Sequence, residues 1–509
     1  MILENNTQRG LGQSLDLKLI ITYLLLVLIG WINIYASIHS SEPASIFDFE
    51  VRSGKQAVWI ATAFILALMI IFVIPPRWWE GFSVWFYVGV VFLLVAVIFL
   101  GTEVKGSRSW FQFGPVSFQP AEISKITTSL LLSMVMSQTN YKISKFKDFL
   151  LTAVIIGLPM LIILGEKETG SALVYVGFIF VLYREGLSGW FLALIGLVIL
   201  LFITTLKVSP YASIVILLAL LCISNAFQAK RHFWKWILLG TGIILVLSLI
   251  PWLWNMIATA AQVKTTTFNA LPYIPMEGEN RHYFWSFIPL IKPLYFILAF
   301  CFGAVIYFSI KAFRQRRTFL GLSVATLIAG LVLIFSTDFI FEDVLQDHQR
   351  KRIEVLLGMK EDPAGVGYNV NQSKIAIGSG GLLGKGYLQG TQTAYGFVPE
   401  QSTDFIFCTV GEEWGFVGCL IVILLYVFLI ARLMYDADRS RESFTRIYGY
   451  CVAACIFMHL FINIGMTVGI MPVIGIPLPL LSYGGSSLWT FTILIFIFIA
   501  LYRQEKKYF

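Results

Sequence analysis

Residues 399–407, Pro-Glu-Gln-Ser-Thr-Asp-Phe-Ile-Phe, and residues 411–415, Gly-Glu-Glu-Trp-Gly, stand at the start of a long apolar run. They place carboxylates and a proline turn directly before a segment that is long enough to enter a bilayer, since about 20 apolar residues cross the hydrocarbon core as a helix. A charge at a membrane boundary is costly to keep there and generally serves a function. The stretch therefore predicts a membrane-spanning helix with a functional site at its beginning.

Apolar runs of this length recur along the whole chain, in which 58% of the residues are hydrophobic and 13% are charged. A soluble multi-domain protein would leave these runs unexplained, so we expect an all-α fold, a polytopic bundle of transmembrane helices. The first run follows a polar N-terminus and lacks a small-residue cleavage site, which indicates a first helix rather than a removed signal peptide. The expected spans are 17–37, 56–75, 82–100, 120–138, 149–165, 170–184, 188–206, 210–228, 233–255, 287–311, 318–340, 405–432, 447–469 and 485–503.

Lysine and arginine cluster in alternate loops, which explains the net charge of +8 better than nucleic-acid binding does. The clusters fall at 142–147, 184, 230–235, 311–317, 432–446 and 503–507. All of them lie on one side if both termini are cytoplasmic, because positive charge marks the cytoplasmic loops. The large loop 341–404 is then extracytoplasmic.

The six cysteines all fall inside the expected spans, and no CxxC or Cys/His spacing occurs. We therefore expect neither an extracellular disulfide nor a cysteine-based metal site.

One pair of charges lies just inside the expected fourth span. Pro120 suits the first turn of a helix, and Glu122 and Lys125 are then three residues apart on one face. The pair is either a structural ion pair or a site for a phosphate or sugar group. Arg108 and Trp110 precede it on the same outer segment.

Other charged segments fall on the predicted outer face. Glu166-Lys167-Glu168 form a turn between two short spans, where an exposed charged turn is nearly as good an explanation as a binding role. Residues 347–352, which include His348 and Arg352, follow the eleventh span on the side where positive charge is otherwise sparse. Arginine there suits a pyrophosphate or lipid headgroup, and snorkelling to outer-leaflet lipid is the alternative.

Three further segments have polar, glycine-rich or proline-rich character. The stretch 378–386, with Lys385, offers permissive backbone for close approach to a ligand. His459 and Asn463 lie one turn apart in the thirteenth span and are expected to hydrogen-bond between helices. The proline-rich segment 472–487, with Ser482, is either a simple helix-entry turn or part of a cavity lining.

Together these segments closely resemble the SEDS family of bacterial cell-wall proteins (shape, elongation, division and sporulation). Gly390-Thr391-Gln392 is similar to the elongation-type rather than the division-type member. The matching stretches occur in family order and are GSRSWFQFGPVSFQPAEISK (106–125), ETGSAL (168–173), DHQRKRI (347–353), DPAGVGYNVNQSKIAIGSGGLLGKGYLQGTQ (362–392), FVPEQSTDFIFCTVGEEWGFVG (397–418) and FINIGMTVGIMPVIGIPLPLLSYGGSS (461–487).

The sequence departs from the family pattern in three places. Ser109 stands where the family usually has arginine, and Glu168 stands where it has aspartate. Residues 207–317 have no counterpart in the usual core of about ten helices and add about four. The expected parts are therefore an N-terminal half of the core (1–206), the inserted helices (207–317), and a C-terminal half (318–509) that includes the outer loop 341–404.

The resemblance implies a peptidoglycan glycosyltransferase that polymerises lipid-linked disaccharide (lipid II) on the outer face of the bacterial cytoplasmic membrane. Such chemistry needs a base for the acceptor hydroxyl and cations for the pyrophosphate leaving group. We assign Asp404 as general base in an inverting reaction, with Lys125, Arg108 and Arg352 as the candidates to hold the pyrophosphate and Glu122 orienting Lys125. The full expected substrate-binding set is Arg108, Trp110, Glu122, Lys125, Glu168, His348, Arg352, Lys385, Glu400 and Ser482.

No dedicated metal site is expected, although a divalent cation (Mg²⁺ or Mn²⁺) bridging pyrophosphate and carboxylate is left open. The resemblance also implies a partner, a class B penicillin-binding protein that crosslinks the new strands. The alternatives are a flippase for the same lipid and a non-catalytic scaffold. A flippase would need polar residues through the full depth of the bundle, whereas the charges of this chain gather at one edge.

Overall fold

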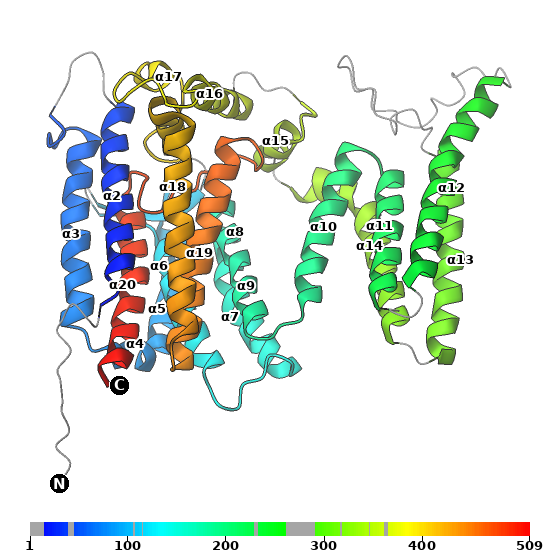
Figure 1. Ribbon diagram of the computed structural model, residues 1–509, viewed down its shortest axis with the longest axis horizontal. Helices are drawn as coiled ribbons and strands as arrows, with labels where there is room; N and C mark the ends of the chain where they lie inside the picture. The colour runs from blue at the N-terminus through cyan, green and yellow to red at the C-terminus, as the bar shows by residue number, and fades with distance from the viewer. Residues whose placement is uncertain are drawn as a thin grey trace, which may run out of the picture. The chain divides into compact units, whose positions relative to one another are not determined.

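The computed structural model describes residues 15–38, 45–104, 107–113, 116–228, 233–260, 291–315, 318–345, 347–360 and 365–508 (Figure 1). The chain forms two compact units, one of Met1–Ser188 with Asp362–Phe509 and one of Gly189–Glu361. The predicted insertion 207–317 lies inside the second unit, which extends beyond it at both ends.

The first unit is a bundle of helices joined by short helical turns and one small sheet. A 3₁₀ turn, η1 (Tyr175–Gly177), connects α8 to α9. The helices are α2 (Leu17–Ile38), α3 (Arg52–Phe72), α4 (Pro76–Gly81), α5 (Ser83–Leu100), α6 (Pro120–Met136), α7 (Phe146–Gly165), α8 (Thr169–Val174), α9 (Phe178–Arg184), α16 (Val366–Ser379), α17 (Thr391–Ala394), α18 (Ile406–Asp438), α19 (Ser443–Thr467) and α20 (Gly485–Tyr508).

The second unit contains the remaining helices, which are α10 (Gly189–Lys207), α11 (Pro210–Gln228), α12 (Phe233–Ala260), α13 (Ile291–Gln315), α14 (Thr318–Phe339), the π-helix η4 (Ile340–Val344) and α15 (Asp347–Leu356). Its core is centred on α11, which buries Tyr211, Ile214 and Leu217.

The predicted polytopic helical fold is confirmed, since every expected span coincides with a helix or, for 170–184, with the series α8–η1–α9. Within the described residues, 11 helices are long and apolar enough to cross a membrane. The expected spans 120–138, 170–184 and 287–311 fall outside that set for physical reasons. α6 has 17 residues and carries charges, α8–α9 is interrupted by the 3₁₀ turn, and the apolar part of α13 is short.

The centre of the first unit is formed by α6, α19 and α20, which pack against one another. α6 is buried on nearly every face, including Glu122 and Lys125. Four of its small polar residues, Ser124, Thr127, Ser129 and Ser133, satisfy their hydroxyls within the helix, as Ser129 Oγ does by donating to Lys125 O at 2.7 Å. The outer helices α3, α5 and α7 bury only about a quarter of their spans, as expected of a lipid-facing surface.

A three-stranded antiparallel sheet in the segment 101–119 is a feature that the all-α prediction lacked. Its strands are β1 (Thr102–Val104), β2 (Ser107–Phe113) and β3 (Val116–Phe118), in the order β1-β2-β3. Aromatic residues favour strands, and glycine in each two-residue connection, Gly106 and Gly114, is typical of hairpins. These signals were present in the sequence but stood between two stronger helical patterns.

The glycine-rich stretch 378–386 of the outer loop is hydrogen-bonded to α18 at a break in that helix. Gly415 has φ +65° and ψ −161°, a conformation that is essentially restricted to glycine. The break lets Phe416 N donate to Gly381 O at 2.9 Å and Val417 N donate to Leu382 O at 3.1 Å. A Cβ at Gly415 would lie 2.3 Å from Gly384 N, so no other residue fits.

Candidate active site

Asp404 lies in the turn that leads into α18 and is half-buried. Its backbone is fixed by α19, because Asn463 Nδ2 donates to Asp404 O at 2.8 Å. The same amide nitrogen donates to Ile476 O at 2.7 Å. One buried asparagine therefore ties the turn at Asp404 to the loop that precedes α20.

That loop, residues 472–482, is held against the turn at a second point. Ser482 Oγ donates to Thr403 O at 2.5 Å and accepts from Leu478 N at 2.8 Å. Tyr483 N donates to Ser402 O at 2.8 Å. Ser482 is thus a buried connector between the two segments, beside the expected base.

Gly475 in the same loop lies against the Asp404 carboxylate. It has φ +76°, and a Cβ at this position would be 3.2 Å from Asp404 Oδ2. Glycine removes both the backbone strain and the side chain that would crowd the carboxylate.

Lys125 on α6 is enclosed by polar partners and has no exposed surface. Its Nζ donates to Glu122 Oε1 at 2.7 Å and lies 2.9 Å from His459 Nε2. The remaining ring nitrogen, His459 Nδ1, lies 3.2 Å from Pro477 O. Since a carbonyl only accepts, Nδ1 carries the proton and Nε2 accepts from the ammonium.

Loop 472–482 joins this charged group to Asp404. His459 and Asn463 are one turn apart on α19, and they contact the adjacent carbonyls of Pro477 and Ile476. The sequence predicted hydrogen bonds between helices for these two residues. His459 contacts Lys125 of α6 in this way, and both side chains also contact backbone carbonyls of loop 472–482. Asp404 and the Glu122–Lys125 pair are therefore two ends of one connected hydrogen-bonded assembly.

Glu168 extends the charged group toward the sheet. Gln119 Nε2 and Ser171 Oγ both donate to Glu168 Oε1, the latter at 2.8 Å. Burial raises the pKa of the Glu168 carboxyl, and the charge of Glu122 adds to this effect, while hydrogen bonds from Ser171 and Ser109 and the nearby charge of Lys125 act in the opposite direction. The two positions that depart from the family pattern, 109 and 168, are thus hydrogen-bonded neighbours.

Glu166 is a second buried carboxyl on the same turn, and it is 2% exposed. Burial raises the pKa of Glu166 to about 8, with a further contribution from the charge of Glu168. Neither of its carboxyl oxygens has a hydrogen-bond partner among the described residues. Of the two alternatives for this turn, an exposed charged turn does not apply at Glu166, which is a buried acid that stays protonated at neutral pH.

Replacing Glu166 by glutamine is expected to reduce the dependence of stability on pH. The folded protein keeps the proton up to about pH 8, whereas the unfolded chain releases it near 4.5. The wild-type free energy of unfolding therefore falls relative to that of the variant as the pH rises from 4.5 to 8. At about 1.4 kcal/mol per pKa unit, the upper bound is about 5 kcal/mol.

Thermal unfolding in detergent from pH 5 to pH 9 measures this difference, with the exposed Glu50→Gln as control. Parallel curves for wild type and Glu166→Gln would show that Glu166 ionises as freely in the folded protein as in the unfolded chain.

The other expected substrate-binding residues of the first unit lie around this assembly. Arg108 on β2 is exposed and pairs with Glu103 at 3.5 Å, and Trp110 on the same strand is half-buried. Glu400 lies in the Asp404 turn with φ +51° and accepts from Thr403 Oγ1 at 3.1 Å.

Lys385 is held by a buried carboxylate of α18. Its Nζ donates to Glu412 Oε1 at 2.7 Å. The Glu412 carboxylate also accepts from the backbone N–H groups of Gln392 and Thr393 at the start of α17. A substrate contact of Lys385 stays a prediction, while its contact with Glu412 secures the outer loop.

His348 and Arg352 lie on α15 and belong to the second unit, so the geometry of the first unit does not include them. Their contact with the pyrophosphate stays a prediction from the sequence.

Sequence reasoning missed one cation that contacts the Asp404 turn. Arg52, the first residue of α3, donates to Ser402 Oγ at 2.5 Å and lies over the Tyr483 ring, 5.8 Å from its centroid. Its position four residues before the expected span 56–75 was the available signal. Among the described residues, no group of three or more His, Cys, Asp or Glu side chains could hold a metal ion, and the mechanism below uses none.

Comparisons with known proteins agree with this architecture. The family model FTSW_RODA_SPOVE, described as "Cell cycle protein", matches residues 16–229 and 278–507. The unmatched residues 230–277 lie within the predicted insertion 207–317.

Two curated relatives match over nearly their whole length. Peptidoglycan glycosyltransferase MrdB of Escherichia coli K12 is 29% identical over 468 residues, which is 92% of this chain and 89% of the relative. Peptidoglycan glycosyltransferase RodA of Treponema pallidum is 29% identical over 484 residues, which is 95% of this chain and 96% of the relative.

A solved chain from "Structural coordination of polymerization and crosslinking by a peptidoglycan synthase complex" shares the fold, with a TM-score of 0.56 and 22% identity. The alignment covers 96% of this chain and 98% of the solved chain. The chain belongs to the FtsW/RodA/SpoVE family of cell cycle proteins, which is the SEDS family that its motifs resemble.

Proposed function

We propose that this membrane protein is the peptidoglycan glycosyltransferase of cell elongation and that Asp404 is its general base. The activity follows from the two relatives, which are peptidoglycan glycosyltransferases aligned over 92–95% of this chain. The observation that supports the site is that Asp404 and Lys125 are connected through loop 472–482.

In the proposed reaction the Asp404 carboxylate accepts the proton of the acceptor sugar hydroxyl. The hydroxyl oxygen attacks the anomeric carbon of the donor, and the bond from that carbon to the pyrophosphate oxygen breaks. The new glycosidic bond forms on the face opposite the leaving group, so the configuration inverts. The undecaprenyl pyrophosphate leaves with the electron pair.

Positive charge near the leaving group stabilises the charge that develops there. Lys125 is enclosed, so we assign it an electrostatic role exerted over a distance rather than a direct phosphate contact. Its charge already acts on the Glu168 carboxyl, and in a low-dielectric interior such effects extend over several ångströms. The exposed Arg108 supplies a direct contact, and Glu122 orients Lys125. A pyrophosphate contact of Arg352, which belongs to the second unit, stays a prediction from the sequence.

The proposed site faces the outer side of the cytoplasmic membrane, with both termini in the cytoplasm. This orientation rests on the basic clusters in alternate loops. The proposed substrate is lipid II. The proposed partner is a class B penicillin-binding protein, in keeping with the synthase complex of the solved structure that shares the fold.

The purified protein in detergent, given fluorescent lipid II, is expected to make glycan chains. A polymerase needs no compartments, whereas a flippase has no product to release in a micelle. Gel separation of the reaction products reads out chain length. Lipid II that stays monomeric with the folded protein, and crosses vesicle membranes when the protein is reconstituted, would instead support the flippase. Lipid II that is neither polymerised in detergent nor moved across the membrane of the vesicles would support the scaffold.

A further inference from the structure

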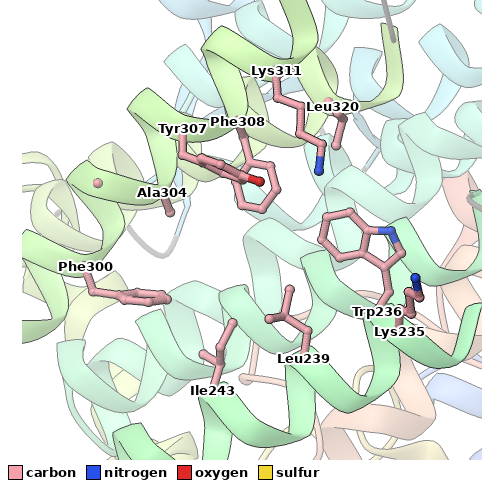
Figure 2. Close-up of a pocket in the computed structure, with 11 residues that line it drawn as sticks. Lys235, Trp236, Leu239, Ile243, Phe300, Ala304, Tyr307, Phe308, Lys311 and Leu320 are labelled. Carbon is pink, nitrogen blue, oxygen red and sulfur yellow. The ribbon is translucent and has the colours of Figure 1, made fainter. Parts of the chain in front are cut away.

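The second unit contains a groove between α12 and α13, bounded at one end by α14 (Figure 2). Its volume is about 770 Å³. α12 packs against α11, and α13 packs against α14, so the groove lies between two helix pairs. The window 233–250 of α12 is only 11% buried, which leaves a long apolar helix with little protein covering it.

One end of the groove is cationic and aromatic. Lys235 and Lys311 line it from α12 and α13 (Figure 2). Lys311 Nζ lies 5.4 Å from the centroid of the Tyr307 ring, and Trp236 packs on Phe308 with ring centroids 5.7 Å apart. Trp and Tyr beside Lys are typical of the boundary between hydrocarbon and headgroups.

The sequence around this end is strongly basic. Residues 228–236 and 311–318 contain seven Lys and Arg and no Asp or Glu. Neither Lys235 nor Lys311 forms an ion pair with a carboxylate in the described part of the chain. The charge at this end is therefore available to an anion.

The rest of the groove is apolar and long. Leu239, Ile243 and Phe300 continue it away from the lysines, and an adjoining cavity extends it along α12 to Ile250. From Lys235 to Ile250 the helix rises by about 22 Å at about 1.5 Å per residue. One leaflet of the hydrocarbon core is about 15 Å thick, so the groove can hold a chain that crosses a whole leaflet.

Two glycines keep the groove open. Gly303 on α13 lines it, and Gly242 on α12 lines the adjoining cavity. A Cβ at either position would meet no atom within 4 Å. Glycine costs about 1 kcal/mol in a helix interior, and neither position needs it for helix packing.

We propose that this groove binds an anionic phospholipid of the surrounding bilayer, with its phosphate between Lys235 and Lys311 and one acyl chain along Leu239, Ile243 and Phe300. A neutral lipid would leave the lysine pair without a counter-charge, and a soluble anion would leave the apolar length uncovered. Bilayer phospholipid is favoured over a polyprenyl phosphate because the basic clusters mark the cytoplasmic leaflet, opposite the proposed polymerisation site. The groove would anchor the second unit at a fixed depth and rotation in that leaflet.

The test uses the purified full-length protein and native mass spectrometry with phosphatidylglycerol, phosphatidylcholine and undecaprenyl phosphate. Wild type is expected to retain phosphatidylglycerol at least tenfold more strongly than phosphatidylcholine. Lys235→Gln and Lys311→Gln are each expected to weaken phosphatidylglycerol binding about fivefold, with Lys207→Gln as the matched control. Gly303→Leu fills the groove and is expected to abolish retention, with Gly196→Leu, another open helical glycine, as its control.

Three results would overturn the proposal. The first is equal retention of the two phospholipids by wild type. The second is phosphatidylglycerol binding that survives both Gly303→Leu and the double lysine variant. The third is undecaprenyl phosphate that displaces phosphatidylglycerol at equal concentration, which would make the groove a carrier-lipid site. If Gly303→Leu fails to fold, the lysine variants decide the question alone.

Discussion

Replacing Lys125 by methionine is expected to destabilise the protein by about 3–5 kcal/mol and to abolish polymerisation. The change leaves the Glu122 carboxylate buried without its cation and removes the donor to His459 Nε2. Thermal unfolding of the detergent-solubilised variant measures the first effect, and the lipid II assay measures the second.

A charge-balanced variant separates stability from catalysis. Glu122→Gln with Lys125→Met removes both charges of the pair, so no buried ion is left alone, and most of the lost stability is expected to return. Polymerisation is expected to stay at least 100-fold below wild type, because the positive charge of the site is still missing. The matched control is Glu185→Gln with Arg446→Met. These residues form a partly buried pair with a 3.0 Å contact, and they lie directly after α9 and in the first turn of α19. Full activity in the Glu122/Lys125 double variant would assign that pair a structural role only.

Replacing Asp404 by asparagine is expected to reduce polymerisation about 10²–10⁴-fold while leaving the fold intact. Asparagine keeps the size of the side chain and one oxygen that can accept hydrogen bonds, and Asn463 holds this residue through its backbone carbonyl. The thermal unfolding midpoint is therefore expected to stay close to that of wild type, and the gel assay is expected to show no chains.

Asp148→Asn, which alters a carboxylate in the first turn of α7, is the matched control and is expected to polymerise normally. A parallel loss of activity in this control would point to a general effect of removing carboxylates from the bundle.

The membrane-spanning helices of this fold could be predicted from sequence because most of them are apolar runs of bilayer length. The short helices α4, α15, α16 and α17 were not predicted, because they are too short or too polar to give that signal. The approach of Glu122 to Lys125 was also predictable, since residues three apart share a helical face. The sheet at 102–118 was not predicted, because short strands carry a weak periodic signal beside long helices.

The connection between Asp404 and Lys125 could not be read from sequence. It depends on where loop 472–482 lies, and that position is set by long-range hydrogen bonds from His459 and Asn463. Similarly, nothing in the spacing of Lys385 and Glu412 indicates that a break at Gly415 brings the glycine-rich loop against α18. Arg52 was overlooked because its partner, Ser402, is 350 residues away.

The most direct test of Asp404 as the general base is the ratio of initial polymerisation rates, Asp404→Asn to wild type, at saturating lipid II in one detergent. The two preparations must have the same folded fraction, so that the ratio reports chemistry alone. We expect a ratio of about 0.01 or less. A ratio near 1 would mean that another group accepts the proton and that Asp404 is not the base.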